Sequence, residues 1–172
     1  ILVANHVGYL DPLLLAGLVP ALPISKREIG SWPLIGRVAR EHGVLFVDRA
    51  DPRSGARVLR QARRALRAGL SVLNFPEGTT TAGDDVLPFR RGIFGLARLA
   101  RVTVVPVALR FDDPELAWFG DALFLPHYVK LLRRRETTIG VRFGGALTPE
   151  RYGSASDLAE EARAAVLHML RA

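Results

Sequence analysis

The residues best suited to chemistry lie at the start of the chain, where Asp11 follows His6 by five positions. The apolar run 1–4 predicts a buried strand that ends just before His6. Asp11 and Pro12 then open a second apolar run, 13–19, which predicts a helix with Asp11 as its N-cap. A histidine at a strand end beside a carboxylate is a candidate general base, because the carboxylate fixes the tautomer of the imidazole.

The same two residues also fit a purely structural interpretation. Asp before Pro commonly does no more than cap a helix, and a single histidine at a strand end is often only a hydrogen-bonded polar residue. Two later segments favour chemistry. Asp48-Arg49 follows the apolar run 44–47, and Glu77-Gly78-Thr79 follows the run 70–75. If the strands are parallel, their carboxyl ends share one edge of the sheet, and these polar groups can meet there.

Such a set of residues suits acyl transfer to an alcohol. His6 would remove the hydroxyl proton, Asp11 would orient the imidazole, and an arginine would bind an anionic head group. Gly78 would let the backbone approach a ligand closely, and neighbouring N–H groups could stabilise an oxyanion.

The elements that must position these residues alternate between strands and helices. Continuous apolar runs flanked by turn residues predict strands, and capped amphipathic stretches predict helices. This alternation indicates an α/β fold with a mostly parallel mixed sheet and helices on both faces. Pro106 predicts an edge or irregular position for its strand. The predicted strands are 1–4, 23–26, 44–47, 70–75, 102–109 and 137–143, and the predicted helices are 13–19, 31–42, 51–68, 92–100 and 156–171.

Composition narrows the class of protein. With 172 residues, 49% of them hydrophobic, we expect residues 1–172 to form one globular domain. The sequence has no cysteine, which excludes disulfides, cysteine–zinc sites and a thiol nucleophile. The formal charge of +7 favours an anionic partner. Because the chain begins without Met inside a predicted core strand, we expect it to be a fragment of a longer protein that has lost an N-terminal anchor.

Four motifs in order resemble those of the PlsC-like glycerolipid acyltransferases. The segment Asn5-His6-Val7-Gly8-Tyr9-Leu10-Asp11 is similar to the H-x4-D motif of that family, although many members have Ser where this chain has Gly8. The second similarity is Gly43-Val44-Leu45-Phe46-Val47-Asp48-Arg49, the third Phe75-Pro76-Glu77-Gly78-Thr79 and the fourth Val104-Val105-Pro106-Val107.

The resemblance implies a role for each motif. His6 would be the catalytic base and Asp11 its partner, whereas Arg49, Glu77 and Gly78 would bind the glycerol phosphate of the acceptor. Pro106 would border the acyl-donor site. The remaining third-motif residues, Phe75, Pro76 and Thr79, are grouped with the substrate-binding residues. The family's fold is a mixed α/β sheet flanked by helices, and its chemistry needs no metal or bound cofactor.

The function that follows is transfer of a fatty acyl group from acyl-CoA or acyl-carrier protein to lysophosphatidic acid, giving phosphatidic acid. We expect the enzyme at the cytoplasmic face of the inner membrane, bound peripherally or through the missing segment. Alternatives are an acyltransferase for another lysolipid such as lyso-ornithine lipid, an esterase or phospholipase that uses water, and a basic lipid-binding module without turnover.

A basic stripe on the predicted helix 51–68 has two interpretations. It is either a solvated helix face or a contact for anionic lipid head groups. Nucleic acid is a poorer partner, because no aromatic stacking platform accompanies the charge. The other histidines, His42, His127 and His168, lack metal-ligand spacing and are expected to be structural or surface residues. The stripe consists of Arg53, Arg57, Arg60, Arg64 and Arg67.

Overall fold

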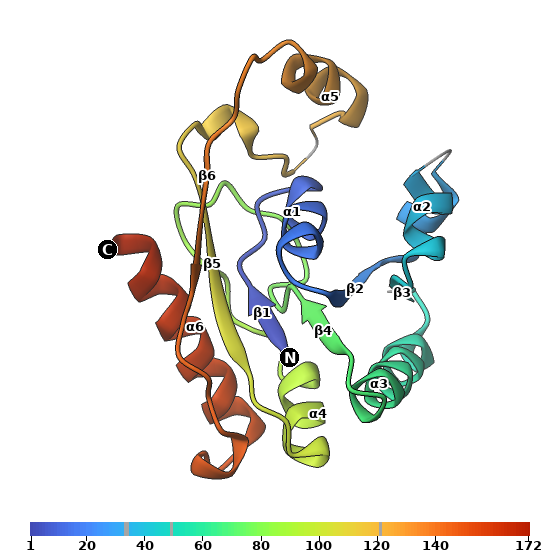
Figure 1. Cartoon of the computed structure of the whole chain (residues 1–172), viewed down its shortest axis with the longest axis vertical. Coiled ribbons are helices and arrows are strands. Elements are labelled where there is room, and N and C mark those ends of the chain that lie inside the picture. Colours follow the sequence, from blue (N-terminus) through green and yellow to red (C-terminus); the bar gives the residue numbers. More distant parts are fainter. Residues whose placement is uncertain (33–34, 49, 121) are drawn as a thin grey trace.

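The computed structural model describes residues 1–32, 35–48, 50–120 and 122–172, with side chains except those of Ile35 and Pro52. Within these residues six strands form one sheet in the order β3-β2-β4-β1-β5-β6 (Figure 1). The first five are mutually parallel, and β6 runs antiparallel to β5. The strands are β1 (Leu2–Ala4), β2 (Ala21–Lys26), β3 (Leu45–Val47), β4 (Ser71–Asn74), β5 (Val105–Phe111) and β6 (Ile139–Phe143).

Helices cover both faces of the sheet. One face packs against α1 (Leu10–Leu18), and the other packs against α3 (Pro52–Arg67), α4 (Gly92–Ala100) and α6 (Ala155–Arg171). Figure 1 shows α5 (Phe124–Leu132) beyond the carboxyl ends of the parallel strands, on the same side of the molecule as α1. The helix α2 (Ile35–Glu41) and the short 3₁₀ helices Arg27–Ser31, Pro114–Leu116 and Pro149–Arg151 complete the described elements. The predicted mixed α/β sheet with two helical layers is therefore confirmed.

The strand β1 lies at the centre of the core. Val3 is fully buried toward α3, α4 and α6, whereas Leu2 and Ala4 pack with Leu15 of α1 on the opposite face. Side chains alternate between the faces of a strand, so this short apolar segment contributes to both halves of the core. Complete burial of one such valine or leucine stabilises the fold by about 1.5–3 kcal/mol. The packing of β1 therefore fixes the position at which His6 leaves the sheet.

Local sequence signals set several element ends. The Asp51 carboxylate accepts a hydrogen bond from the Arg53 N–H at 2.8 Å and caps α3, as predicted. Gly69 has a positive φ of 79° and follows the end of that helix, which also agrees with the sequence signal. Ser154 caps α6 by accepting from the Asp157 N–H.

The predicted positions of Asp11 and Pro106 each require a correction. Asp11 is not an N-cap, because α1 begins at Leu10 and the Asp11 carboxylate points back toward the preceding loop. Of the two positions predicted for Pro106, the edge strand is wrong, because β5 lies between β1 and β6, whereas the irregular position is confirmed. Pro106 lies where regular pairing with β6 stops, and its carbonyl accepts a hydrogen bond from the Gly144 N–H. Its missing N–H is therefore tolerated inside the sheet.

The segment 31–42 also differs from the single helix predicted there. Residues Arg27–Ser31 form a 3₁₀ helix and α2 begins only at Ile35, whereas residues 33 and 34 lie outside the described part of the chain. The helix α5 was not predicted from the sequence. Among the described helices, none is both long enough and apolar enough to cross a membrane.

Candidate active site

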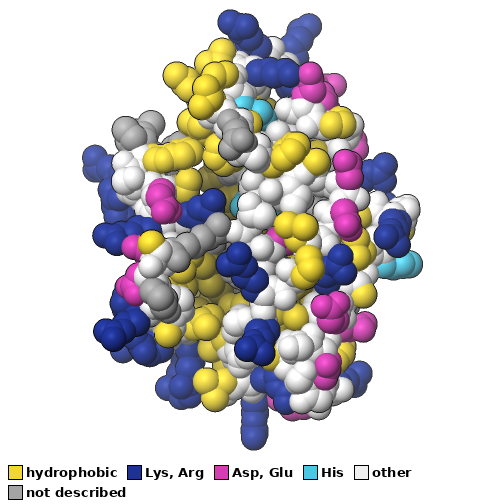
Figure 2. Space-filling model, turned by 180° about the vertical axis from the view of Figure 1, so that it is seen from behind, with side chains coloured by type: hydrophobic (Ala, Val, Ile, Leu, Met, Phe, Trp, Pro, Cys, Tyr) yellow, Lys and Arg dark blue, Asp and Glu magenta, His cyan; other side chains and the backbone are white. Residues whose placement is uncertain are grey.

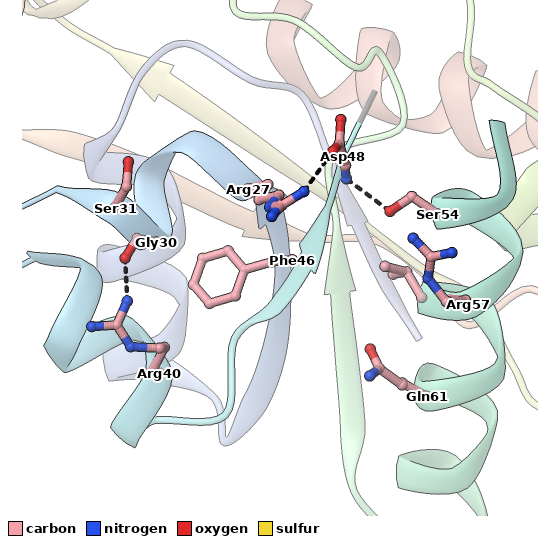
Figure 3. Close-up of a pocket in the computed structure, with 10 residues that line it drawn as sticks. Arg27, Gly30, Ser31, Arg40, Phe46, Asp48, Ser54, Arg57 and Gln61 are labelled. Carbon is pink, nitrogen blue, oxygen red and sulfur yellow. Dashed lines mark hydrogen bonds and ion pairs between the residues drawn. The ribbon is translucent and has the colours of Figure 1, made fainter. Parts of the chain in front are cut away.

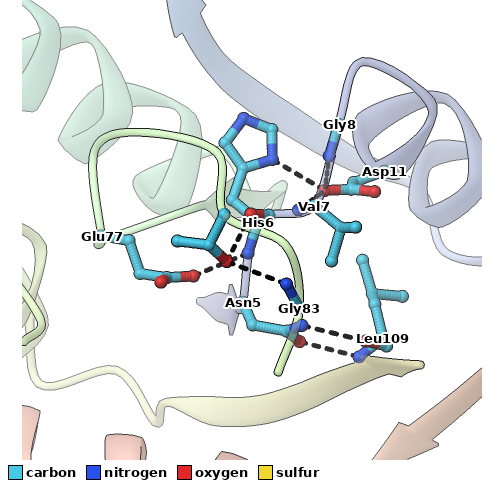
Figure 4. A network of polar contacts seen from close by, with 9 residues as sticks. Asn5, His6, Val7, Gly8, Asp11, Glu77, Gly83 and Leu109 are labelled. Carbon is cyan, nitrogen blue, oxygen red and sulfur yellow. Dashed lines mark hydrogen bonds and ion pairs between the residues drawn. The ribbon is translucent and has the colours of Figure 1, made fainter. Parts of the chain in front are cut away.

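His6 and Asp11 form a close pair at the carboxyl end of β1. The Nδ1 atom of His6 lies 2.7 Å from Oδ2 of Asp11 (Figure 4). The same oxygen accepts hydrogen bonds from the backbone N–H groups of Val7 at 2.6 Å and Gly8 at 3.0 Å. The Asp11 side chain is completely buried, whereas the His6 side chain remains 21% exposed. The carboxylate is therefore held inside the loop, and the imidazole is accessible.

This geometry selects one tautomer of His6. An ionised carboxylate oxygen only accepts hydrogen bonds, so Nδ1 of His6 carries the proton and donates it to Asp11. The lone pair is then on Nε2, the ring nitrogen away from the carboxylate. The imidazole ring also stacks on Phe75 with a centroid separation of 4.3 Å, which restricts its orientation. A histidine fixed in this way can accept a proton at Nε2.

The backbone of His6 is anchored on both sides by the loop after β4. Its N–H donates to Oε1 of Glu77 at 2.7 Å, and its carbonyl accepts from the Thr81 N–H at 2.8 Å. The second oxygen of Glu77 accepts from the Leu87 N–H at 2.8 Å. Glu77 is buried, and this burial raises the pKa of its carboxyl group. Both carboxylate oxygens of Glu77 are thus bonded to backbone groups.

Asn5 links this corner to the neighbouring strand β5. Its buried side-chain amide donates to the Leu109 carbonyl at 2.9 Å and accepts from the Leu109 N–H at 2.8 Å (Figure 4). Pro106 lies farther down the same strand, buried and paired in register with Val3. The contact between β5 and the His6 corner is thus made by Asn5 and Leu109, and Pro106 lies deeper in the sheet.

The other third-motif residues lie around a tight turn. Gly78 has φ of 75°, and a Cβ atom there would lie 2.8 Å from the guanidinium of Arg90. The Pro76 carbonyl accepts from the Arg90 N–H, and Thr79 is exposed to solvent. Sequence reasoning did not single out Asn5, Thr81 or Arg90. Asn5 directly precedes His6, and Arg90 begins an Arg-Arg-Gly segment before α4, so both had a local signal.

The segment around α5 packs against the loop between His6 and Asp11. The Trp118 N–H donates to the Val7 carbonyl at 2.9 Å, and the Tyr9 hydroxyl lies 3.0 Å from Nδ1 of His127. Nε2 of His127 lies 3.2 Å from the Glu115 carbonyl, which can only accept, so Nδ1 accepts from Tyr9. Burial raises the pKa of Tyr9, so its hydroxyl retains the proton that it donates.

A second polar region lies at the carboxyl end of β3. A cavity of about 670 Å³ opens between α2, β3 and α3, with Arg27, Arg40 and Arg57 in its lining (Figure 3). Arg27 donates to Asp48 at 2.9 Å, and this hydrogen bond lowers the pKa of the Asp48 carboxyl group. Arg49, which was predicted to bind the acceptor substrate, lies outside the described residues. In the sheet order, β2 and β4 lie between β3 and the strand that carries His6.

The structure therefore brings some predicted residues together and separates others. His6, Asp11, Phe75 and Glu77 form one corner, with Gly78 in the adjoining turn. Asp48 belongs to the separate cavity at β3. Among the described side chains, no three His, Asp or Glu residues gather in a way that could hold a metal ion.

Sequence comparison identifies the family. The family model described as Acyltransferase matches residues 1–110, which span the His6 corner and the β3 cavity. A lyso-ornithine lipid O-acyltransferase from Pseudomonas aeruginosa is 34% identical and aligns with 95% of this chain and 65% of its own length. A 1-acyl-sn-glycerol-3-phosphate acyltransferase from Neisseria gonorrhoeae is 31% identical, with 95% and 68% covered. This chain belongs to the acyltransferase family.

The fold agrees with a solved structure of this family. The crystal structure of the 1-acyl-sn-glycerophosphate (LPA) acyltransferase PlsC from Thermotoga maritima matches 99% of this chain with a TM-score of 0.71 and 25% sequence identity. That match covers 64% of the crystallised chain. A lyso-ornithine lipid O-acyltransferase from Rhizobium meliloti is 31% identical over 92% of this chain and 60% of its own length. The chain thus spans roughly two thirds of the length of these relatives.

Proposed function

We propose that this chain catalyses transfer of a fatty acyl group from an acyl thioester to the free hydroxyl of a lysolipid, with His6 as general base. The observation that carries the proposal is the His6–Asp11 pair, in which Asp11 holds the proton on Nδ1 and leaves Nε2 to act. Membership in the acyltransferase family supports the same reaction class. Acyl-CoA and acyl-carrier protein are the candidate donors, and both present the acyl group as a thioester.

The reaction follows from this arrangement. Nε2 of His6 removes the proton from the lysolipid hydroxyl as its oxygen attacks the thioester carbonyl. A carbon–oxygen bond forms, and the carbonyl oxygen becomes negatively charged in a tetrahedral intermediate. When the carbonyl re-forms, the carbon–sulfur bond breaks and the departing sulfur takes the proton from His6. Asp11 stabilises the imidazolium between these two steps, because its buried carboxylate already bonds to Nδ1.

Glu77 acts in this proposal by holding the base rather than by binding substrate. Its two oxygens bond to the N–H groups of His6 and Leu87, and the carboxylate is buried. The backbone of the catalytic residue is thereby attached to the loop after β4. Gly78 keeps the turn in its positive-φ conformation beside Arg90.

The acceptor head group is proposed to bind toward the β3 cavity. Three arginines, Arg27, Arg40 and Arg57, supply positive charge there, and Arg49 follows the last residue of β3 by two positions in the sequence. A phosphate monoester carries more negative charge than the head group of a lyso-ornithine lipid, so we favour lysophosphatidic acid as acceptor and phosphatidic acid as product. Lyso-ornithine lipid is the second candidate, because relatives named for that substrate are as similar to this chain as those named for the glycerophosphate.

The decisive experiment measures lipid products directly. The purified protein receives acyl-CoA or acyl-carrier protein together with radiolabelled lysophosphatidic acid or lyso-ornithine lipid in mixed micelles. We expect the diacyl product with lysophosphatidic acid, and we expect His6→Ala to slow its formation by at least about 100-fold. His42→Ala is the matched control, because His42 is an exposed histidine outside the corner and should leave turnover unchanged.

Each alternative predicts a different product pattern. Free fatty acid without diacyl lipid would identify a hydrolase that uses water as acceptor. Product formed only from lyso-ornithine lipid would support the proposed acyl transfer and identify lyso-ornithine lipid as the acceptor. Vesicle binding with no turnover on any lysolipid, equal in the parent and His6→Ala proteins, would identify a lipid-binding module and overturn the proposal.

A further inference from the structure

The helix α5 has an apolar face that the fold leaves in solvent. Leu125, Val129 and Leu132 recur at positions i, i+4 and i+7, so they form one stripe, called here the α5 apolar stripe. Leu125 is 66% exposed and Leu132 is 64% exposed. The helix buries none of its described side chains completely. An apolar helix that leaves its leucines in water is typical of a surface that binds an apolar partner.

The adjacent aromatic face of α5 explains why the helix nevertheless has a fixed position. Phe124 stacks on Tyr128 at 5.5 Å and contacts the ring of Tyr9 edge-on at 4.9 Å. Tyr9 belongs to the loop between His6 and Asp11, and its hydroxyl bonds to His127. Aromatic contacts therefore attach α5 to the catalytic loop and direct the α5 apolar stripe away from the protein.

Positive charge borders the stripe at the carboxyl end of the helix. The segment 130–135 contains one lysine and three arginines and no acidic residue. Lys130 and Arg134 form ion pairs with Glu115 and Asp113, whereas Arg133 and Arg135 extend into solvent. Figure 2 shows hydrophobic and basic side chains gathered together at the end of the molecule that carries α5. Exposed leucines beside cations complement the apolar and anionic layers of a bilayer.

An apolar pocket lies beside this surface. It has a volume of about 470 Å³ and lies between α1 and the segment that follows α5. Leu10, Leu13 and Leu14 contribute from α1, the helix that also carries Asp11, and Leu131 contributes from α5. Leu13 is itself exposed. Leu131 of α5 thus shares an apolar pocket with three leucines of α1.

We infer that the α5 apolar stripe and the exposed Arg133 and Arg135 seat the protein on an anionic bilayer, with the His6 corner toward the lipid. The inference rests on the proposed function, in which acceptor and product are both lipids. It names the surface that makes the membrane contact, which the arginine stripe of α3 does not provide. On α3 the apolar residues Val58 and Ala62 are buried in the core, so the exposed arginines there have no apolar residue to insert.

The test compares two pairs of matched variants in vesicle co-sedimentation. Leu125→Ser with Leu132→Ser removes the apolar contact, and Leu70→Ser with Leu99→Ser is its control, since Leu99 on α4 is 65% exposed at the other end of the molecule. Arg133→Gln with Arg135→Gln removes two charges from the α5 surface. Arg60→Gln with Arg64→Gln removes two exposed charges from α3.

The expected results separate the two surfaces. On vesicles of phosphatidylcholine mixed with phosphatidylglycerol, the leucine variant should lose at least about tenfold in partitioning. The Arg133/Arg135 variant should lose about fivefold for each charge removed, and this loss should shrink in high salt. Both control variants should bind like the parent protein. Circular dichroism and thermal unfolding confirm that each variant is folded.

Three outcomes would overturn the inference. The first is binding by the α5 variants equal to that of the parent. The second is a larger loss in the α3 variant than in the α5 variants. The third is a leucine variant that binds vesicles like the parent but is a monomer where the parent is a dimer. That result would show that the stripe contacts a second copy of the chain. Turnover of a dispersed short-chain lysolipid is measured alongside. The leucine variant should retain this turnover. If the parent itself shows no turnover, the proposed reaction is wrong, and the inferred membrane contact is unaffected.

Discussion

The Glu77 carboxylate accepts a hydrogen bond from the backbone N–H of His6 at 2.7 Å, across 71 positions of sequence. Its other oxygen accepts from Leu87. Each oxygen of Glu77 thus already bonds to a backbone N–H group, and the carboxylate fixes where the His6 backbone lies.

Replacing Glu77 by Gln should therefore lower kcat and stability together. The amide N–H₂ group would face one of the two backbone donors and leave it unpaired, at a cost of about 1–3 kcal/mol in the free energy of unfolding. The KM for the lysolipid should barely change. Steady-state kinetics and urea unfolding measure these effects, with the exposed Glu150→Gln as control. A higher acceptor KM with unchanged stability would show that Glu77 contacts the acceptor.

The free energy of unfolding should depend on pH differently in the parent protein and in Glu77→Gln. Burial raises the pKa of Glu77 above its ordinary value of 4.5. A carboxyl group whose folded-state pKa is raised stabilises the fold most below its unfolded pKa, and this contribution is lost as pH rises through the folded value. The stability of the parent relative to Glu77→Gln should thus be greatest below pH 4.5 and decline above it. Urea unfolding across this range tests the sign, and a relative stability that increases with pH would contradict it.

His6→Ala should lower kcat by about 10²–10⁴-fold, the usual contribution of a positioned general base. Asp11→Asn should have a milder effect. Because the N–H groups of Val7 and Gly8 point at the same oxygen as His6, an asparagine should place its amide oxygen there and preserve the tautomer. Loss of the negative charge should then cost about tenfold in kcat. Single-turnover kinetics distinguish the two variants, and equal losses would indicate that Asp11→Asn reverses the amide.

Arg27→Ala should lower kcat/KM for the acceptor if the β3 cavity binds the anionic head group. A charged hydrogen bond of about 1.5–3 kcal/mol corresponds to roughly a ten- to 100-fold loss. Arg49→Ala is expected to behave alike, and Arg49→Lys to recover only part, because an ammonium cannot reproduce a planar guanidinium. Arg60→Ala is the control on the exposed side of α3. Loss of donor affinity with acceptor affinity intact would assign these arginines to the thioester substrate.

Gly78→Ala should destabilise the fold for two separable reasons. The residue has φ of 75°, and its new Cβ would lie 2.8 Å from the Arg90 guanidinium. Together these should cost about 1–3 kcal/mol in the free energy of unfolding. In an Arg90→Ala background only the backbone strain should remain, so a double-mutant cycle by thermal unfolding reports the contact. Additive effects would show that Arg90 moves away freely. Gly55→Ala, in an open position within α3, should be neutral or slightly stabilising.

Much of the site around His6 could be predicted from the sequence, because His6 and Glu77 each follow an apolar run. The runs before His6 and Glu77 predicted parallel strands whose carboxyl ends share an edge, and the structure joins these two residues there. The partner of the Glu77 carboxylate was not predictable in this way, since a backbone N–H leaves no signature in the residue types. The cap predicted at Asp11 failed for a related reason. Its carboxylate bonds to the loop before the helix, whose path depends on tertiary packing.

The helix α5 could not be anticipated from its own residues. It contains Pro126, buries no complete face and spans nine residues, too few for a stable helix in isolation. Its residue Phe124 contacts Tyr9, which is remote in sequence, and Trp118, which precedes the helix. Tertiary packing rather than helix propensity determines the structure of this segment.

The central place of β1 has a consequence for how the protein folds. Its neighbours are β4 and β5, which begin at Ser71 and Val105, so neither partner exists until much of the chain has been synthesised. Asn5 and Leu109 are 104 positions apart, and closing a loop of that length precedes any gain from their hydrogen bonds. Parallel pairing over such separations is slow. On the ribosome, β1 should therefore remain an unpaired apolar segment, available to a chaperone, until β4 has emerged, and one of its edges should stay open until β5 follows.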